Sequence, residues 1–393
     1  MINSSLTQPN KLESNDYRYD FFNDGKVLFA KRKGRLPAMG WNSWNAFGSG
    51  NNEELTRITA EKFIELGLDK LGYEYLVLDD GCYKSERVDG RLSNEEQKVP
   101  GGFRALADFI HSKGLKFGMY NDIGTNLCAG AAVGTCGHEQ EDAASYIEWD
   151  VDFLKVDNCY YLWDNATFSN GENAKYVYAP AIGRVEIVRG SSDDDAGDRQ
   201  FRLEFVPGKS MYTTGDGVHT ELIEDRLYFT NIGTFDGTGP ARTPVGVQSG
   251  EVVIEAEVPE DGEYELVIDH INGVEPGRGS WLQIAVDDAY IFDDILDSDR
   301  IKLDLKSGIR KIRFMNHRRQ ENTLMSYAKL LEGLKEAAPG RDLVYSLCEW
   351  GKTQPQNWGR KLADSWRILN DITFSVGSDG NPGNANWTSD YTN

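Results

Sequence analysis

Cysteines and long apolar segments are scarce in this sequence of 393 residues. The five cysteines are Cys82, Cys128, Cys136, Cys159 and Cys348. They are too few and too scattered for a disulfide framework, and no CxxC pair or Cys/His cluster indicates zinc. We therefore expect mostly free thiols and a cytoplasmic protein. No segment approaches the roughly 18 apolar residues of a membrane span, and the first 33 residues lack the pattern of a signal peptide.

Basic residues are also in the minority. The chain has 42 Lys and Arg against 63 Asp and Glu, which gives a net charge of −21. An acidic surface repels phosphate backbones and anionic lipids, so neither nucleic acid nor a membrane is an expected partner. Hydrophobic residues make up 39% and aromatic residues 11% of the chain, a composition typical of globular proteins.

Short apolar segments alternate with helical patterns in the first part of the chain. Strands are predicted at residues 38–41, 75–78, 115–119 and 153–156. Between them, Phe103, Leu106 and Ile110 recur at helical spacing, as do Ala143 and Ile147. A strand about every 40 residues, each followed by a helix, indicates parallel β/α units. The strands are apolar throughout, as expected when both faces are buried.

The pattern changes in the middle of the chain. Apolar and polar residues alternate around Ile254–Val258, Tyr264–Ile268 and Ile301–Leu305, which is typical of an antiparallel β-sandwich. An acidic segment at 191–198 is expected to be a solvated loop. A helix then resumes with Tyr327, Leu331 and Leu334, and another apolar strand is predicted at 343–347.

The sequence thus predicts an α/β protein, a (β/α)8 TIM barrel with about six of its eight units present and an inserted all-β jelly-roll or β-sandwich. The predicted domains are an extension at 1–35, the first part of the barrel at 36–172, the sandwich at 173–325 and the second part of the barrel at 326–393. The tail at 377–393, rich in Gly, Asn, Ser and Asp, is expected to be a loop. The insertion lies where barrel loops usually lengthen, at the face that carries active sites.

Acidic, basic and aromatic residues follow each predicted barrel strand. They are Trp41, Asp79, Asp80, Tyr120, Asp122, Lys155, Asp157, Glu349, Trp350, Arg367 and Asp371. The carboxyl ends of barrel strands form the rim where substrates bind. A single carboxylate could instead cap a helix or pair with a lysine, and Trp41 or Trp350 could be core residues. Repetition at six strand ends favours a site.

Two aspartates carry the predicted chemistry. Lys155 and Asp157 point the same way on a strand, and the lysine would favour the charged carboxylate that a glycosidase nucleophile requires. Arg367 precedes Asp371 by four residues and would oppose an acid role there, whereas burial and a bound sugar would favour one. The sequence leaves that balance open.

Asp79 and Asp80 form a vicinal acid pair. Such a pair could bind a metal, but no third carboxylate or histidine stands at a useful spacing. Hydrogen bonds to neighbouring sugar hydroxyls are the better interpretation, and no metal or cofactor is expected.

Six ordered motifs resemble glycoside hydrolase family 27, the α-galactosidases and α-N-acetylgalactosaminidases. They are Gly40-Trp-Asn-Ser-Trp-Asn45, Leu78-Asp-Asp80, Gly118-Met-Tyr-Asn-Asp122, Leu154-Lys-Val-Asp-Asn-Cys159, Cys348-Glu-Trp-Gly351 and Ser365-Trp-Arg-Ile-Leu-Asn-Asp371. The resemblance covers roughly residues 36–166 and 324–374.

The resemblance implies roles for the residues of these motifs. Asp157 would be the nucleophile and Asp371 the acid/base, while Asp79 and Asp80 would bind the far hydroxyls of galactose. A sugar subsite would be lined by Trp41, Tyr120, Lys155, Glu349, Trp350 and Arg367. The bulky Glu349 favours galactose over N-acetylgalactosamine. Cys128 and Cys159 match a family disulfide beside the site.

Three functions follow as hypotheses. The first is a retaining exo-α-galactosidase acting on an α-galactoside oligosaccharide or glycoconjugate. The second is an α-N-acetylgalactosaminidase or β-L-arabinopyranosidase, because these sugars share the ring pattern of galactose. The third is a catalytically incompetent fragment that only binds carbohydrate, since the family has two further barrel strands and six strands leave two open edges. The insert resembles carbohydrate-binding modules, with Trp281, Tyr290 and Phe292 as either a sugar platform or packing residues.

Overall fold

The computed structural model of the chain contains two compact units. The residues that it describes are 36–160, 179–189, 201–214, 220–229, 251–271, 281–287, 289–316, 318–351, 355–368, 374–375 and 386–387. Among these, residues 36–160 and those from 324 onward belong to one unit, and residues 179–323 belong to the other.

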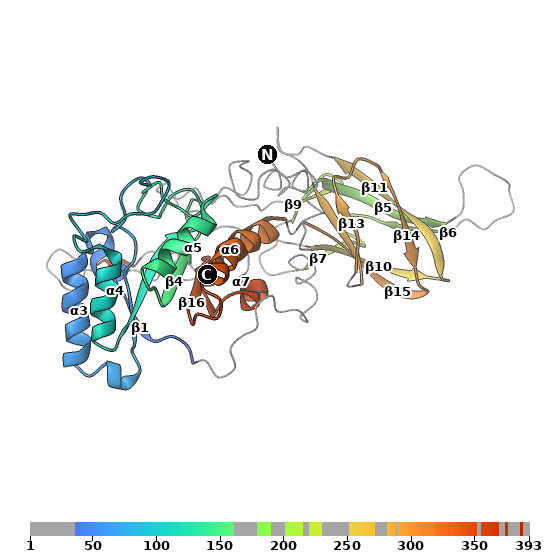
Figure 1. Cartoon of the computed structure of the whole chain (residues 1–393). Coiled ribbons are helices and arrows are strands. Elements are labelled where there is room, and N and C mark those ends of the chain that lie inside the picture. Colours follow the sequence, from blue (N-terminus) through green and yellow to red (C-terminus); the bar gives the residue numbers. More distant parts are fainter. Residues whose placement is uncertain are drawn as a thin grey trace. The chain divides into compact units, whose positions relative to one another are not determined.

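A parallel six-stranded sheet forms the centre of the first unit (Figure 1). Its strands, in their order across the sheet, are β1 (Gly40–Asn42), β2 (Tyr75–Val77), β3 (Lys116–Asp122), β4 (Phe153–Asp157), β16 (Val344–Cys348) and β17 (Ser365–Trp366). Spatial order follows chain order, as in a β/α-barrel. The predicted fold class is confirmed, with six barrel strands among the described residues. The predicted strand at 38–41 is wrong by two residues at its start, and β3 extends to Asp122.

Helices follow the strands and cover the sheet. The longer ones are α3 (Glu53–Glu65), α4 (Gly102–Ser112), α5 (Glu139–Glu148) and α6 (Arg318–Ala337), which succeed one another across Figure 1. Asn52 caps α3 by accepting a hydrogen bond from the Leu55 amide. Phe103, Leu106 and Ile110 are buried on α4, as their spacing predicts. Short turns complete the unit: α2 (Trp44–Phe47), η3 (Gly48–Gly50), η4 (Asp69–Leu71), α7 (Pro355–Trp358) and η6 (Gly359–Lys361).

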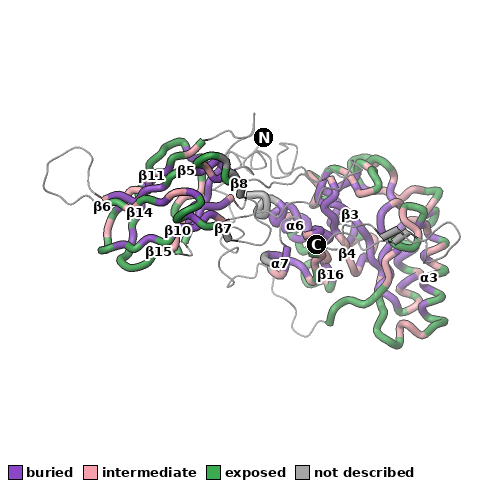
Figure 2. Tube along the Cα trace, turned by 180° about the vertical axis from the view of Figure 1, so that it is seen from behind, coloured by how far each residue is buried: buried purple, intermediate pink, exposed green. Residues whose placement is uncertain are grey.

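Helix α6 explains how the late strand β16 comes to lie beside β4. The Tyr345 hydroxyl donates to the Tyr327 carbonyl (2.9 Å), and the Tyr327 hydroxyl donates to the Val156 carbonyl (3.4 Å). Gly333 lets α6 approach α5, because a Cβ at this position would lie 3.0 Å from that of Ala143. The tube in Figure 2 is buried along this seam of β3, β4 and α6. As a result, the ends of β4 and β16 are adjacent in the fold.

The second unit contains two antiparallel sheets around one apolar core. One sheet has the order β13-β12-β15-β10-β7 and the other β14-β11-β5-β9-β8, with β6 paired to β5. The strands are β5 (Ala181–Arg189), β6 (Phe201–Phe205), β7 (Tyr212–Thr214), β8 (Thr220–Ile223), β9 (Arg226–Phe229), β10 (Glu251–Val258), β11 (Gly262–Ile271), β12 (Leu282–Val286), β13 (Ala289–Asp294), β14 (Arg300–Leu305) and β15 (Gly308–Met315). The alternating residues of β10, β11 and β14 are buried together, so the predicted β-sandwich pattern is confirmed.

Of the two alternatives for Trp281 on this sandwich, a sugar platform or a packing residue, the structure supports packing. This side chain is only 1% exposed, and its Nε1 donates to Asp293 Oδ1 at 2.7 Å. Phe292 packs against the apolar core. Both are therefore packing residues, and a buried indole offers no face to a sugar ring.

The predictions for the tail, for the acidic segment and for the domain boundaries have different outcomes. The tail is not wholly a loop, because β19 (Asn386–Trp387) pairs with β18 (Phe374–Ser375). The segment 191–198 and the boundary at 172/173 lie outside the described residues, and the boundary at 325/326 falls inside α6.

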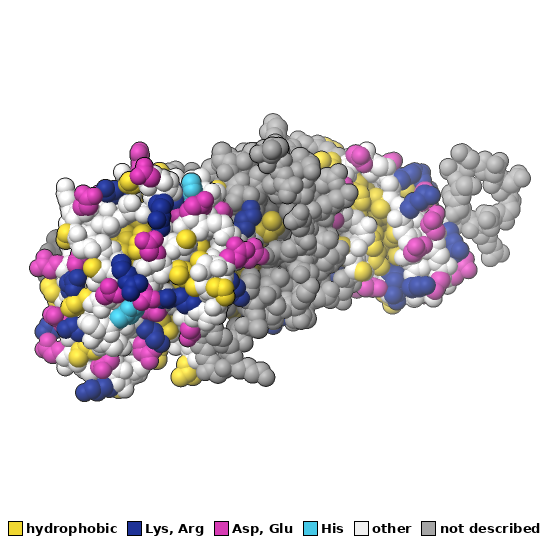
Figure 3. Space-filling model, in the orientation of Figure 1, with side chains coloured by type: hydrophobic (Ala, Val, Ile, Leu, Met, Phe, Trp, Pro, Cys, Tyr) yellow, Lys and Arg dark blue, Asp and Glu magenta, His cyan; other side chains and the backbone are white. Residues whose placement is uncertain are grey.

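None of the described helices is long and apolar enough to cross a membrane. On the face shown in Figure 3, acidic and basic side chains are interspersed.

Candidate active site

Asp157 lies at the carboxyl end of β4 and is 3% exposed. The Tyr120 hydroxyl donates to Oδ2 of this carboxylate at 2.9 Å. On the other oxygen, Oδ1 accepts from the Trp350 indole at 2.6 Å and from the Asn158 amide at 2.9 Å. One donor lies on β3, one lies two residues beyond β16, and one is the residue that follows β4. Together they fix both carboxylate oxygens in position.

Lys155 precedes Asp157 by two residues, and its direct partner is Asp79. Its ammonium lies 2.8 Å from Asp79 Oδ2, which also accepts from Asn42 Nδ2 at 2.6 Å. Burial lowers the pKa of Lys155, but the nearby carboxylates of Asp79 and Asp157 help to raise it above its usual value. The lysine therefore contributes a fixed positive charge at the strand ends, as predicted, but pairs with a different aspartate.

Asp80 has an unused acceptor. It is 1% exposed, and its Oδ2 accepts from the Ala129 amide at 2.6 Å. Its Oδ1 is buried and has no hydrogen-bond partner among the described residues. Burial raises the pKa of Asp80 to about 6, with a smaller contribution from Asp79, while the Ala129 amide lowers it. A buried acceptor without a donor is the kind of group that a ligand hydroxyl can satisfy.

Glu349 and Trp350 follow β16 and are both buried. Glu349 Oε1 accepts from Asn158 Nδ2 at 3.2 Å. Trp350 has a φ of +67°, which bulky residues rarely adopt, and the Arg367 guanidinium lies 4.7 Å from its ring centroid. Arg367 Nη1 also donates to Cys348 Sγ at 3.3 Å. The indole is therefore held in one place as a donor to the carboxylate at the end of β4.

Asp122 connects the ends of β3 and β4. It is fully buried, and its two oxygens accept from the Gly124 amide (2.7 Å) and the Cys159 amide (2.6 Å). Cys128 and Cys159 are both free cysteines in the structure. Their sulfurs and a carboxylate oxygen of Asp157 lie within 4.8 Å of one another. The disulfide implied by the resemblance therefore stays a prediction.

A buried ion pair anchors the loop that follows β3. Arg87 donates to both carboxylate oxygens of Asp142 at 2.5 and 2.8 Å, and its Nη2 also donates to the Gly134 carbonyl at 2.8 Å. Asp142 is 0% exposed and Arg87 10% exposed at the side chain. The loop between β3 and α5 thus ties to the loop after β2, and it carries the Ala129 amide that contacts Asp80.

The concave face of the sheet encloses space beside these residues. A cavity of about 710 Å³ is lined by residues of β1, β2, β4, β16 and β17, among them Trp41, Lys155, Cys348 and Arg367. Trp41 is half-buried and packs edge-on against Phe47 with ring centroids 5.7 Å apart. This cavity therefore brings together side chains predicted for the sugar subsite.

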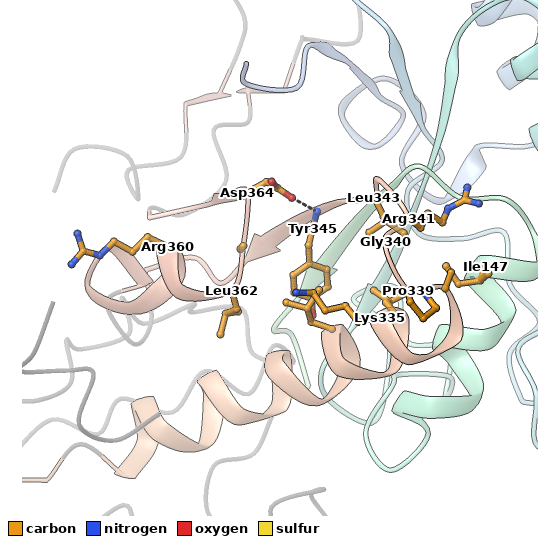
Figure 4. Close-up of a pocket in the computed structure, with 14 residues that line it drawn as sticks. Ile147, Lys335, Pro339, Gly340, Arg341, Leu343, Tyr345, Arg360, Leu362 and Asp364 are labelled. Atoms are coloured by element: carbon orange, nitrogen blue, oxygen red, sulfur yellow. Dashed lines mark hydrogen bonds between the residues drawn. The ribbon is translucent and has the colours of Figure 1, made fainter. Parts of the chain in front are cut away.

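A second cavity, of about 360 Å³, lies at the other end of β16 (Figure 4). Figure 4 shows Lys335, Arg341, Tyr345 and Asp364 around it, between the end of α6 and the start of β16. The Asp364 carboxylate accepts from the Tyr345 amide at 2.9 Å. Barrel enzymes act at the carboxyl ends of their strands, so this cavity is not the candidate active site.

The structure brings together nearly all of the predicted site residues. Asp157, Lys155, Tyr120, Asp79 and Trp350 are linked by direct contacts. Asp371 lies outside the described residues. Two side-chain amides at the site were not predicted: Asn42 donates to Asp79, and Asn158 donates to Glu349. Their only sequence signal was their place inside the Gly40–Asn45 and Leu154–Cys159 motifs.

Comparisons with known proteins agree with this geometry. A family profile described as alpha galactosidase A matches residues 36–187. An alpha-galactosidase of Cyamopsis tetragonoloba is 43% identical over 205 residues, which is 50% of this chain and 47% of that protein. One of Lachancea cidri is 47% identical over 145 residues, or 36% of this chain and 30% of that protein. The chain therefore spans less than half of the length of each of these two relatives.

Solved structures give a weaker likeness. An alpha-galactosidase of Saccharomyces cerevisiae with raffinose has a TM-score of 0.45 and 21% identity, covering 87% of this chain and 41% of that one. The family profile covers β1 to β4 and their loops, where Asp79, Asp80, Tyr120, Lys155 and Asp157 lie. The profile match and the two relatives therefore show that the part of this chain that includes β1 to β4 is similar to α-galactosidases.

Proposed function

We propose that this chain is a retaining, exo-acting α-galactosidase, which removes terminal α-galactose from oligosaccharides or glycoconjugates. The observation that carries the proposal is the Asp157 carboxylate, held by the Tyr120 hydroxyl and the Trp350 indole at the rim of the sheet. A carboxylate so fixed is suited to attack a sugar ring from one side. The relatives that share this part of the chain are alpha-galactosidases.

In the proposed reaction, Asp157 attacks the anomeric carbon and the bond to the leaving oxygen breaks. The sugar becomes an ester of Asp157, while Asp371 gives its proton to the leaving oxygen. Asp371 then takes a proton from water, whose oxygen attacks the same carbon and releases the Asp157 carboxylate. Two displacements keep the α configuration. The role of Asp371 rests on its motif, Ser365 to Asp371.

Recognition of galactose is assigned to the residues around this carboxylate. The free Oδ1 of Asp80 would accept from a sugar hydroxyl, and Asp79 would orient the Lys155 ammonium toward another. Trp41 and Arg367 line the adjoining cavity. The buried Glu349 would leave no room for an acetamide group, which favours galactose over N-acetylgalactosamine.

A comparison of three aryl glycosides tests this function. We expect the α-galactoside to be hydrolysed with a higher kcat/KM than the α-N-acetylgalactosaminide and the β-L-arabinopyranoside. Proton NMR of the first product should show α-galactose before mutarotation. Release of β-galactose would rule out retention, and preference for another glycoside would change the substrate. If all three stay intact while galactose still binds by calorimetry, the chain is a carbohydrate-binding fragment.

The pH dependence of substrate binding should report on Asp80. Because its pKa is raised to about 6, it is charged at pH 7 and protonated at pH 5. A protonated carboxyl accepts fewer hydrogen bonds, so we expect KM for the aryl α-galactoside to rise as pH falls below 6, by at most about tenfold per pH unit. In Asp80→Asn, KM should be high at both pH values.

The matched control for this experiment is Asp108→Asn. Asp108 lies on α4, where it is exposed and pairs with Arg104 at 2.9 Å. This variant should keep the pH profile of the unmodified chain. An Asp80→Asn variant whose KM still rises between pH 7 and pH 5 would show that another group titrates there.

A further inference from the structure

One lysine joins the loops that follow the first two barrel strands. The ammonium of Lys98 donates to the Ser49 carbonyl and, at 2.6 Å, to the Gly81 carbonyl. Ser49 belongs to the turn η3 after β1, and Gly81 lies four residues beyond the end of β2. The same ammonium therefore holds two segments that lead away from the proposed sugar subsite.

The two loops touch at Gly81. Its φ is +105°, and a Cβ on this residue would lie 2.7 Å from the Cα of Ser49, closer than real Cβ atoms come. Because both carbonyls point at one nitrogen, their partial negative charges face each other, and the ammonium of Lys98 balances them. The thiol of Cys82 adds a weaker link, since it donates to the Asn51 carbonyl at 3.3 Å.

The backbone around Lys98 is itself anchored. Its carbonyl accepts from the Glu53 amide, at the start of α3, at 2.8 Å, and its own amide donates to the Glu95 carbonyl at 3.0 Å. The buried Glu53 carboxylate in turn accepts from the Gly101 amide at 2.9 Å. The ammonium therefore reaches the two loops from a fixed base, which lowers the entropy that a flexible lysine would lose in making these bonds.

Gly81 connects this lysine to the carboxylate beside it. Burial raises the pKa of Asp80 to about 6 and Asp79 adds to the rise, whereas a hydrogen bond from the Gly81 amide lowers it. Since Lys98 holds the carbonyl of Gly81, it also holds that amide in place. The Oδ1 atom of Asp80, which has no partner among the described residues, is then kept in one position for a ligand hydroxyl.

We propose that Lys98 is a positioning residue for the sugar subsite, which acts through Gly81 to keep the Asp80 carboxylate directed at a sugar hydroxyl. The effect on substrate rests on the proposed function, whereas the effect on Asp80 does not. Asp157 has its own donors on β3 and beyond β16. The loss of Lys98 should therefore weaken substrate binding much more than the chemical step.

Lys98→Met tests this role, because it removes the ammonium and keeps an apolar side chain. At pH 7 we expect KM for the aryl α-galactoside to rise about tenfold and kcat to change by less than about threefold. The pKa of Asp80, followed by carboxyl ¹³C NMR, should rise, since the charged form loses a donor. Lys98→Arg, which keeps a charged donor, should stay close to the unmodified chain in both respects. The matched control is Lys84→Met, whose lysine pairs with the exposed Glu96 at 2.9 Å.

A lysine with a merely structural role would lower the melting temperature without moving KM or the pKa of Asp80, and that result in Lys98→Met would overturn the proposal. A fall in kcat at unchanged KM would do the same, as would equal effects of Lys98→Met and Lys98→Arg. Should Lys98→Met fail to fold, Lys98→Gln is measured against the same expectations. If the unmodified chain hydrolyses no galactoside, the proposed function fails, whereas the NMR titration still decides whether Lys98 acts on Asp80.

Discussion

Asp157→Asn is expected to lower kcat/KM for an aryl α-galactoside by on the order of 10⁴-fold or more, because an amide cannot form the glycosyl ester. The substitution keeps the size of the side chain. Its carbonyl oxygen can still accept from Tyr120 or Trp350, which donate to the carboxylate in the structure. The fold and the affinity for galactose should therefore survive. Steady-state kinetics and calorimetry with galactose measure the two effects separately.

A second variant at this position tests the direct attack itself. Asp157→Gly leaves space beneath the sugar, and added azide can enter it and attack the anomeric carbon in place of the carboxylate. Because only one displacement then occurs, the product should be β-galactosyl azide, identified by NMR. The control is Asp152→Asn, since Asp152 precedes the other end of β4 and pairs with His111 at 2.7 Å. An Asp157→Asn variant with more than a tenth of normal turnover would refute the assignment.

The hydrophobic pattern of the sequence predicted the fold more reliably than it predicted which side chains contact one another. Apolar strands bounded by polar residues predicted β2, β4 and β16 to within a residue at each end, because burial of both faces leaves few other interpretations. It also put Lys155 and Asp157 on one side of a strand. It could not tell that Lys155 pairs with Asp79, since that contact depends on how far apart β2 and β4 lie.

Contacts between distant segments account for what the sequence analysis missed. Trp350 was considered a sugar platform or a core residue, and the structure makes it a buried donor to Asp157 through a backbone conformation with positive φ. Trp281 is an aromatic residue of the kind that can stack on a sugar, but the packing of β12 and β13 buries it. No local pattern contains either fact, because both are set by tertiary packing.

The largest effect on stability is expected at Arg87. Arg87→Met should lower the free energy of unfolding of the barrel unit by about 3–5 kcal/mol at pH 7, because it leaves the buried Asp142 without its bidentate partner. Burial already raises the pKa of Asp142 to about 6 even though Arg87 lowers it. Without the guanidinium this pKa should rise further, so the carboxyl would be neutral over a wider range of pH.

The sign of the pH effect follows from that shift. A carboxyl whose pKa is raised in the folded state costs stability as the pH rises above its unfolded value near 3.8, and the cost grows until the folded value is passed. At pH 5 the Asp142 carboxyl is largely protonated with or without Arg87. The destabilisation by Arg87→Met should therefore be smaller at pH 5 than at pH 7. Urea unfolding at the two pH values, with hydrogen exchange of α5 to identify the barrel unit, measures it.

Arg91→Met is the matched control, because Arg91 joins the same two segments through an exposed pair. Its Nη2 lies 2.6 Å from Glu148 Oε2, and both side chains are more than half exposed. An exposed pair contributes about 0–1 kcal/mol, so this variant should unfold almost as the unmodified chain does. The double variant Arg87→Met with Asp142→Leu should recover much of the loss, since an apolar pair leaves no buried charge. Equal destabilisation by Arg87→Met and Arg91→Met would mean that burial of Asp142 does not govern the stability of this loop.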